Sequence, residues 1–212
     1  MELEIKNISK TIRGKNILKE ISLSLHSGKI YGFVGKNGSG KTMLFRAISG
    51  LMTIDSGEII WDGKVLHRDF SVLPSQGIVI ENAGLYPDLT GFENLKYLAG
   101  LTGKIGNKEI KHAILRVGLD PGDKRIYKKY SLGMKQRLAI AQAIMESPDV
   151  IMLDEPTNAL DEEGVSDIRK IVLEEKARGA VILIASHNSE DIRILADEKY
   201  YIENGRIKVP TD

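Results

Sequence analysis

The sequence contains no cysteine among its 212 residues. The chain can therefore form no disulfide and offers no thiolate as a nucleophile or metal ligand, which suits a reducing compartment. No apolar run approaches the roughly 18 residues that a membrane-spanning helix needs. The charged start, residues 1–6, also lacks the apolar core of a signal peptide. We therefore expect a cytoplasmic protein, whose membrane role, if it has one, comes through a partner.

Net charge is almost absent as well. The 30 Lys and Arg residues against 29 Asp and Glu residues give a formal charge of +1 at pH 7. Such a balance creates no global field that would attract nucleic acid or an anionic membrane. We therefore expect no nucleic-acid partner. Hydrophobic residues make up 42% of the chain, which is typical of a globular domain with a substantial core.

The most informative stretch is a glycine-rich loop, Gly35-Lys36-Asn37-Gly38-Ser39-Gly40-Lys41-Thr42. It fits G-x-x-x-x-G-K-[ST], the phosphate-binding P-loop, and lies between a predicted strand, 29–34, and a predicted helix, 43–48. Its glycines let backbone N–H groups point at phosphate oxygens, and the helix N-terminus adds a positive dipole. Lys41 supplies charge for the β- and γ-phosphates, and the Thr42 hydroxyl can ligate Mg²⁺. A chance glycine-rich turn is the alternative, and the flanking strand and helix disfavour it.

Two carboxylates follow a second apolar run, 149–153. Asp154 and Glu155 stand where a parallel strand ends, and that edge of a sheet faces the ligand crevice. Asp154 suits Mg²⁺, directly or through water, and Glu155 could orient or deprotonate the attacking water. Two acidic residues that merely end a strand before Pro156 are the alternative. The P-loop elsewhere in the chain favours the functional interpretation.

Strand patterns predict a mixed sheet. Alternating apolar and polar residues at 3–6 and 21–25 predict two half-buried strands near the N-terminus. The turn residues Asp62-Gly63 and Asn204-Gly205 each separate two short apolar segments and predict a hairpin. The run 180–184 is apolar without alternation, which is typical of a central parallel strand. We therefore expect a parallel core with antiparallel strands around it.

Helix patterns dominate residues 85–146. Thr90, Asn107 and Ser131 are each predicted to cap a helix whose apolar residues recur at helical spacing. The whole pattern predicts one α/β domain over 1–212. It would consist of a P-loop NTPase core with a mixed sheet, an N-terminal antiparallel β subdomain and an α-helical subdomain at about 85–146.

A further segment gives a specific family resemblance. Residues 130–138, Tyr-Ser-Leu-Gly-Met-Lys-Gln-Arg-Leu, lie between the two nucleotide motifs and resemble the signature sequence of ATP-binding cassette (ABC) ATPases. Residues 158–161 resemble the family's D-loop, His187 matches its switch histidine, and 77–81 lie where it has its Q-loop. The resemblance covers essentially the whole chain, from residue 1 to about 208. It implies the ABC ATPase fold, with ATP and Mg²⁺ as cofactors.

The resemblance also implies a dimer. Ser131, at a helix N-cap and followed by Gly133, exposes N–H groups, a hydroxyl and a positive dipole, so it could form a second phosphate site. In the family this site closes on the P-loop of a second copy in a head-to-tail homodimer, with ATP at the interface. Asp161 of the D-loop joins the nucleotide-binding residues on the same resemblance. His187 could hydrogen-bond the γ-phosphate and fix the catalytic water.

Four positions depart from the family pattern. Glu81 stands where the family usually has glutamine, although either side chain can reach Mg²⁺ or its water through an oxygen. In the signature, Leu132 replaces the first glycine and Met134 the glutamine. Ile12 stands near the place of an aromatic residue that stacks on adenine, and isoleucine gives less stacking. With Glu81, the stretch 85–90 resembles the bacitracin- and lantibiotic-resistance exporters.

These features predict an ATP-binding and hydrolysing subunit of an ABC transporter. It would power a separate membrane permease, which would hold it at the inner face of the cell membrane, and the subgroup resemblance favours export. A soluble ABC ATPase acting on nucleic acid or ribosomes is one alternative, and the short chain and small net charge disfavour it. A regulatory module with little turnover is another. Glu155 and His187 disfavour that module, whereas Glu81 and Ile12 leave it open.

Overall fold

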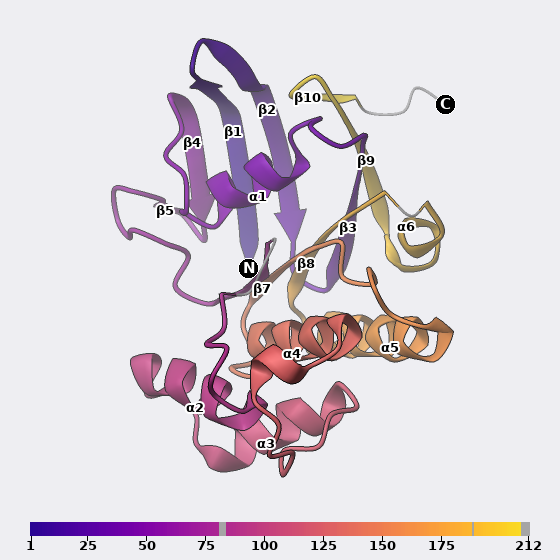
Figure 1. The fold of residues 1–212 in the computed structure, drawn as a ribbon. Helices are drawn as coiled ribbons and strands as arrows, with labels where there is room; N and C mark the ends of the chain where they lie inside the picture. Colours follow the sequence, from indigo (N-terminus) through magenta and orange to yellow (C-terminus); the bar gives the residue numbers. More distant parts are fainter. Residues whose placement is uncertain (81–83, 188, 209–212) are drawn as a thin grey trace.

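The computed structural model describes residues 1–80, 84–187 and 189–208, and over these ranges the strands form two sheets (Figure 1). The first sheet has the order β2-β1-β4-β5, and all of its pairings are antiparallel. Its strands are β1 (Glu2–Ile12), β2 (Lys15–His26), β4 (Ser56–Trp61) and β5 (Lys64–Val65). The alternation of apolar and polar residues predicted this half-buried sheet.

The second sheet has the order β10-β9-β3-β8-β7-β6, and only the β9–β10 pairing is antiparallel. Its strands are β3 (Lys29–Val34), β6 (Gln76–Val79), β7 (Val150–Asp154), β8 (Val181–Ser186), β9 (Glu198–Glu203) and β10 (Arg206–Lys208). The central strands β3, β7 and β8 are almost fully buried, as their unbroken apolar runs predict. Because these strands are parallel, the segments that follow them meet at one edge of the sheet.

Helices cover both faces of this second sheet. They are α1 (Lys41–Ile48), α2 (Gly91–Thr102), α3 (Asn107–Arg116), α4 (Leu132–Ile144), α5 (Glu162–Arg178) and α6 (Ser189–Leu195), with a 3₁₀ turn at Tyr127–Lys129. One apolar cluster joins α1, the antiparallel sheet and one face of the second sheet, and it contains Phe33 and Phe45. The other joins the opposite face to α2–α6 and contains Leu138 and Ile184. Figure 1 shows α1 beside the antiparallel sheet and α2–α5 at the other end of the molecule.

One predicted helix cap is wrong. Thr90 and Ser131 cap their helices by accepting a hydrogen bond from the backbone N–H three residues on. Asn107, in contrast, is the first residue of α3, and Gly106 is the N-cap. The Glu109 carboxylate accepts the Gly106 N–H at 3.0 Å, which satisfies the helix end without a side chain at the cap position. The segment 85–146, where we expect a helical subdomain, holds α2, α3 and α4.

Candidate nucleotide site

The P-loop fills the turn between β3 and α1. Helix α1 begins at Lys41 with Gly40 as its N-cap and carries no side-chain cap, so its first N–H groups stay available to an anion. A Cβ atom at Gly35 would lie 2.4 Å from the carbonyl oxygen of Ile202 and 2.5 Å from Ser39 Oγ. Only glycine fits there, and its absent side chain lets the loop fold back against β9. The structure thus forms the tight loop that the motif predicts.

Lys41 lies inside this loop and is only 6% exposed. Its Nζ donates to the carbonyl oxygen of Gly35 at 2.6 Å and to that of Lys36 at 3.4 Å. The hydroxyl of Ser39 is buried and has no hydrogen-bond partner within the described ranges. A buried hydroxyl without a partner is costly unless a ligand satisfies it. The ammonium of Lys41 and the hydroxyl of Ser39 could therefore both bind phosphate oxygens.

Thr42 and Asp154 come together from distant parts of the chain. Thr42 Oγ1, in the first turn of α1, donates to Asp154 Oδ2 at 2.5 Å, and Asp154 ends β7. A hydroxyl and a carboxylate are the oxygen donors that Mg²⁺ takes beside the phosphates of a nucleotide. The donor set that the sequence predicts is therefore assembled here and fits that ion.

Glu155 and His187 form a direct pair beside this cluster. The Glu155 carboxylate contacts His187 Nδ1 at 2.8 Å, and it accepts the His187 backbone N–H at 2.9 Å and the Ser186 hydroxyl at 3.2 Å. Glu155 has φ of 52°, a left-handed conformation uncommon for a side-chain-bearing residue, and such strain clusters at functional sites. Its N–H donates to the Ala185 carbonyl at 2.8 Å, which holds the turn against β8. The pair can accept a proton at the carboxylate and present the imidazole to a ligand.

Two hollows flank the P-loop. One, of about 480 Å³, is lined by Lys15, Ile17, Asn37, Gly38, Gly40, Lys41, Thr42, Met43, Asp154 and Glu155. The other, of about 720 Å³, lies between residues 34–39 and the β9–β10 hairpin. In that hairpin, the Lys208 ammonium lowers the pKa of Glu203 by hydrogen bonding, and Lys36 adds a smaller effect through its charge. The predicted P-loop residues and the carboxylates Asp154 and Glu155 thus line these two adjoining hollows.

Ser131, Gly133 and Asp161 meet in a different hollow. It has a volume of about 570 Å³ and is also lined by Leu132, Met134 and residues 159–160. Ser131 Oγ accepts the Met134 N–H at 3.2 Å, and Asp161 Oδ1 accepts the Gly164 N–H at 2.9 Å, so both residues cap helices. The structure brings these three predicted residues together, yet none of them lines either hollow beside the P-loop.

One predicted residue, Ile12, lies apart from these groups, and another is not described. Ile12 is 38% exposed and pairs with Lys15 across the β1–β2 hairpin, but only Lys15 lines the hollow beside the P-loop. Glu81, our predicted Mg²⁺ ligand of the Q-loop, lies outside the described residues. Lys15 and Ile17 are the described β2 residues that line this hollow, and no motif pointed to them.

Ile12 gives a direct test of the base position. A tyrosine placed there should tighten ATP binding, because an aromatic ring stacks on adenine better than isoleucine does. We expect Ile12→Tyr to improve the dissociation constant for ATP by about three- to tenfold, since stacking contributes about 1 kcal/mol per base or more. Calorimetric titration with ATP measures this, and Ile12→Val serves as the control that keeps an aliphatic side chain. Equal ATP affinities for wild type, Ile12→Tyr and Ile12→Val would show that Ile12 does not contact the base.

Sequence reasoning missed two supporting contacts. Gln136 Nε2, in the signature helix, donates to the carbonyl oxygens of Glu155 at 3.2 Å and Pro156 at 3.0 Å. The Gly205 N–H donates to the Ser39 carbonyl at 3.0 Å, so the β9–β10 turn supports the P-loop. The sequence signalled Gln136 only as part of the signature and Gly205 only as a hairpin turn. Neither the signature nor the hairpin turn indicates which distant carbonyl groups these two residues contact.

The fold and this geometry define a P-loop ATPase. The family model described as "ABC transporter" matches residues 18–158, and the chain therefore belongs to the ABC transporter family. The protein is an ATP-binding subunit of this family, and it hydrolyses ATP. The expected family and fold class are both confirmed. Within the described ranges, no helix combines the length and the apolar character needed to cross a bilayer.

Several known proteins resemble the chain along most of its length. YybJ of Bacillus subtilis, an uncharacterized ABC transporter ATP-binding protein, is 47% identical over 206 residues, which cover 97% of this chain and 94% of YybJ. The lantibiotic transport ATP-binding protein SrtF of Streptococcus pyogenes is 37% identical and covers 97% of this chain and 88% of SrtF. A solved ATP-binding subunit of an ABC transporter superimposes with a TM-score of 0.88 at 26% identity, covering 99% and 89% of the two chains.

Proposed function

We propose that this chain drives export through a membrane permease that is a separate polypeptide. The observation that carries the catalytic part is the contact of Glu155 with His187, beside the cluster of Lys41, Thr42 and Asp154. The direction of transport rests on the resemblance to the bacitracin- and lantibiotic-resistance exporters. Two relatives fit it by name: SrtF is named for lantibiotic transport, and BcrA of Enterococcus faecalis, 38% identical over 197 residues, for bacitracin transport. BcrA is covered over 64% of its length, against 92% of this chain.

Each residue of the cluster has a chemical role in this proposal. The P-loop N–H groups, Ser39 and Lys41 would bind the phosphates of ATP. Thr42 and Asp154 would hold Mg²⁺, which supplies charge neutralisation between the β- and γ-phosphates when bound. Glu155 would accept a proton from the attacking water. His187, fixed by the same carboxylate, would hydrogen-bond the γ-phosphate. The chain's own contribution is thus positioning and electrostatics.

A second copy of the chain would complete the site. The hollow that holds Ser131, Gly133 and Asp161 is separate from the hollows beside the P-loop. The N-terminus of α4 in that hollow, with Ser131 as its cap, suits an anion. In a head-to-tail homodimer this surface would close over the ATP held by the other copy. The cassette MJ0796, which shares this fold at a TM-score of 0.85 and 23% identity, is described as dimeric.

The permease would dock on the helical subdomain, which we assign to about 85–146 of the single domain 1–212. An apolar hollow of about 320 Å³ lies there, lined by Tyr86, Pro87, Asp88, Leu89 and Tyr97. The exposed rings of Tyr86 and Tyr97 meet edge to face, with centroids 5.1 Å apart. Leu85, the neighbour of Tyr86 in the sequence, is buried and packs in the apolar cluster that includes α2.

Hydrogen bonds join this hollow to the signature. The Tyr127 N–H donates to the Leu89 carbonyl at 2.7 Å, and the Lys128 N–H donates to the Pro87 carbonyl at 2.9 Å. Residues 127–129 lead directly to Ser131 at the start of α4. Closure of a dimer over ATP would therefore move the docking hollow as part of a rigid body. Through the docked permease, the chain would stay at the inner face of the membrane.

Charge placed in the hollow should separate docking from catalysis. We expect Tyr86→Glu and Leu89→Asp to lose co-purification with the membrane fraction, because an apolar interface does not accept an unpaired charge. ATPase activity of the purified protein should stay within about twofold of wild type, as expected for a surface change. Leu115→Asp, which changes an exposed leucine on α3, is the matched control. Full membrane retention of both hollow variants would place the docking surface elsewhere.

A further inference from the structure

Asp191 is a completely buried carboxylate that follows His187 of the proposed catalytic pair by four residues. Its exposed fraction is 0%. Asp191 Oδ1 accepts Arg169 Nε at 2.9 Å and Nη2 at 2.6 Å, while Oδ2 accepts the Thr157 hydroxyl. Burying a charge is costly unless it is paired and hydrogen-bonded, and removal of either partner from such a pair is strongly destabilising. We therefore expect Asp191, Arg169 and Thr157 to keep fixed positions relative to one another.

The three segments that meet at Asp191 all lead to the nucleotide site. Thr157 lies two residues after Glu155. Arg169 belongs to α5, whose N-cap is Asp161. Asp191 itself belongs to α6, which begins two residues after His187. The bond between Thr157 and Asp191 thus joins the same two chain segments as the contact between Glu155 and His187.

His187 needs such external support. Its side chain is 60% exposed, so packing restricts its orientation little. In the part of the chain that the structure describes, the polar contacts of His187 run to Glu155, through the ring and the backbone N–H. An exposed ring can hold a catalytic geometry only if the backbone that carries it is fixed.

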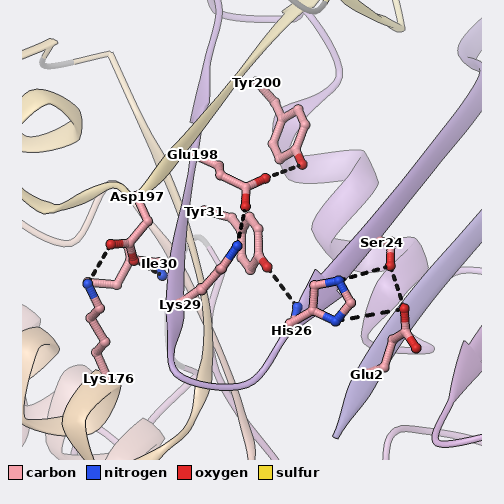
Figure 2. Close-up of polar contacts among 10 residues, drawn as sticks. All are labelled: Glu2, Ser24, His26, Lys29, Ile30, Tyr31, Lys176, Asp197, Glu198 and Tyr200. Atoms are coloured by element: carbon pink, nitrogen blue, oxygen red, sulfur yellow. Dashed lines mark hydrogen bonds and ion pairs between the residues drawn. The ribbon is translucent and has the colours of Figure 1, made fainter.

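The other end of α6 is anchored independently. Asp197, two residues after the end of α6, accepts Lys176 Nζ at 2.5 Å and the Ile30 N–H at 2.8 Å. Both contacts are drawn in Figure 2. Burial raises the pKa of Asp197, but these two hydrogen bonds and the charges of Lys176 and Lys29 together hold the pKa below its ordinary value. Gly32 lets α6 approach β3, since a Cβ atom there would lie 2.6 Å from Ile192 Cγ2. Asp197 therefore fixes the C-terminal end of α6, which is the end farther along the chain from His187. The N-terminal end, next to His187, is held by Asp191.

We propose that Asp191 is a positioning residue for ATP hydrolysis. Its bonds to Thr157 and Arg169 set the distance and orientation of His187 relative to Glu155. This inference rests on the roles proposed above for Glu155 and His187. Asp191 is fully buried, and it acts by fixing the backbone of His187 relative to the segment that carries Glu155.

The sharpest test removes one hydroxyl. Thr157→Val conserves the side-chain volume but cannot donate to Asp191, whereas Thr157→Ser keeps the donor. We expect Thr157→Val to lower kcat about tenfold or more, because a misplacement of about 1 Å can cost about a hundredfold in rate. The dissociation constant for ATP should stay within about twofold, since the P-loop is untouched, and Thr157→Ser should restore kcat. Arg169→Lys, which keeps the charge but loses the two-nitrogen contact, should resemble Thr157→Val.

A spectroscopic readout separates positioning from stability. The chain has four histidines, so NMR of ¹⁵N-labelled histidine can resolve the ring signals of His187 from the other three. Thr157→Val should shift or broaden the His187 signals alone. Asp197→Asn, which loosens the far end of α6, should lower the melting temperature but leave kcat and the His187 signals unchanged.

Two outcomes would overturn the inference. One is a Thr157→Val protein with the kcat of Thr157→Ser and with unchanged His187 signals. The other is an equal loss of kcat in Asp197→Asn, which would indicate general loosening of α6. Glu155→Gln, measured in parallel, keeps the two proposals distinguishable. If Glu155→Gln loses turnover and Thr157→Val does not, only the positioning role of Asp191 fails. Wild-type turnover in Glu155→Gln would instead remove the catalytic assignment on which that role rests.

Discussion

Glu155→Gln should retain ATP binding and lose nearly all ATP turnover. Glutamine has the size of glutamate and can keep contacts to Ser186 and His187, but its neutral amide cannot accept a proton from water. General-base catalysis contributes about a hundredfold to ten-thousandfold in rate, so we expect kcat to fall by at least about a hundredfold. Steady-state phosphate release measures kcat, and calorimetry measures ATP binding.

A second consequence concerns the dimer. If ATP closes two copies of the chain and hydrolysis opens them, Glu155→Gln should accumulate as an ATP-dependent dimer in size-exclusion chromatography. Glu163→Gln, which changes an exposed glutamate in the first turn of α5, is the control and should behave as wild type. A wild-type rate of ATP hydrolysis in Glu155→Gln would show that another group accepts the proton from the attacking water.

The site could be predicted where its geometry is local or follows from strand order. The P-loop is a run of neighbouring residues whose conformation depends on its own glycines and on the strand and helix beside it. Thr42 and Asp154 lie far apart in sequence, but each follows a predicted parallel strand, and such strands end at one edge of a sheet. Their contact at 2.5 Å is the outcome of that rule.

The supporting contacts could not be predicted, because no local pattern encodes them. From the sequence, Asp191 is one of two acidic residues in a short helix, and only the tertiary structure places it, fully buried, against Arg169 and Thr157. Gln136 likewise reaches the carbonyl oxygens of Glu155 and Pro156 through helix packing. Such bonds depend on the relative placement of whole elements, which composition and periodicity leave open.

The same limit applies to burial of single apolar residues. Leu85 and Tyr86 are neighbours in a loop, and residue type alone does not tell which of the two is exposed. In the structure Leu85 is buried in the cluster below α2, while Tyr86 is exposed and pairs with Tyr97. The loop is fixed by Asn94, a fully buried amide that donates to the Tyr86 carbonyl at 3.1 Å and accepts its N–H at 2.7 Å. That side-chain bond, rather than residue type, decides which of the two faces outward.

The other large effect is expected at Lys41. Lys41→Ala removes the ammonium that the P-loop holds through the carbonyl oxygens of Gly35 and Lys36. Hydrogen bonds to charged groups contribute about 1.5–3 kcal/mol each, so the dissociation constant for ATP should rise about ten- to a hundredfold. Calorimetric titration of the purified protein with ATP measures the change.

A matched variant and a melting curve make the Lys41 result interpretable. Lys36→Ala removes an exposed ammonium from the same loop but keeps its backbone, and exposed charges contribute at most about 1 kcal/mol, so ATP affinity should fall at most about fivefold. Loss of a cation from the N-terminus of α1 relieves repulsion with the helix dipole. The melting temperature of Lys41→Ala without ATP should therefore equal or exceed that of wild type, and weak binding could not then be attributed to unfolding. An unchanged ATP affinity in Lys41→Ala would contradict the role of this lysine in holding phosphate.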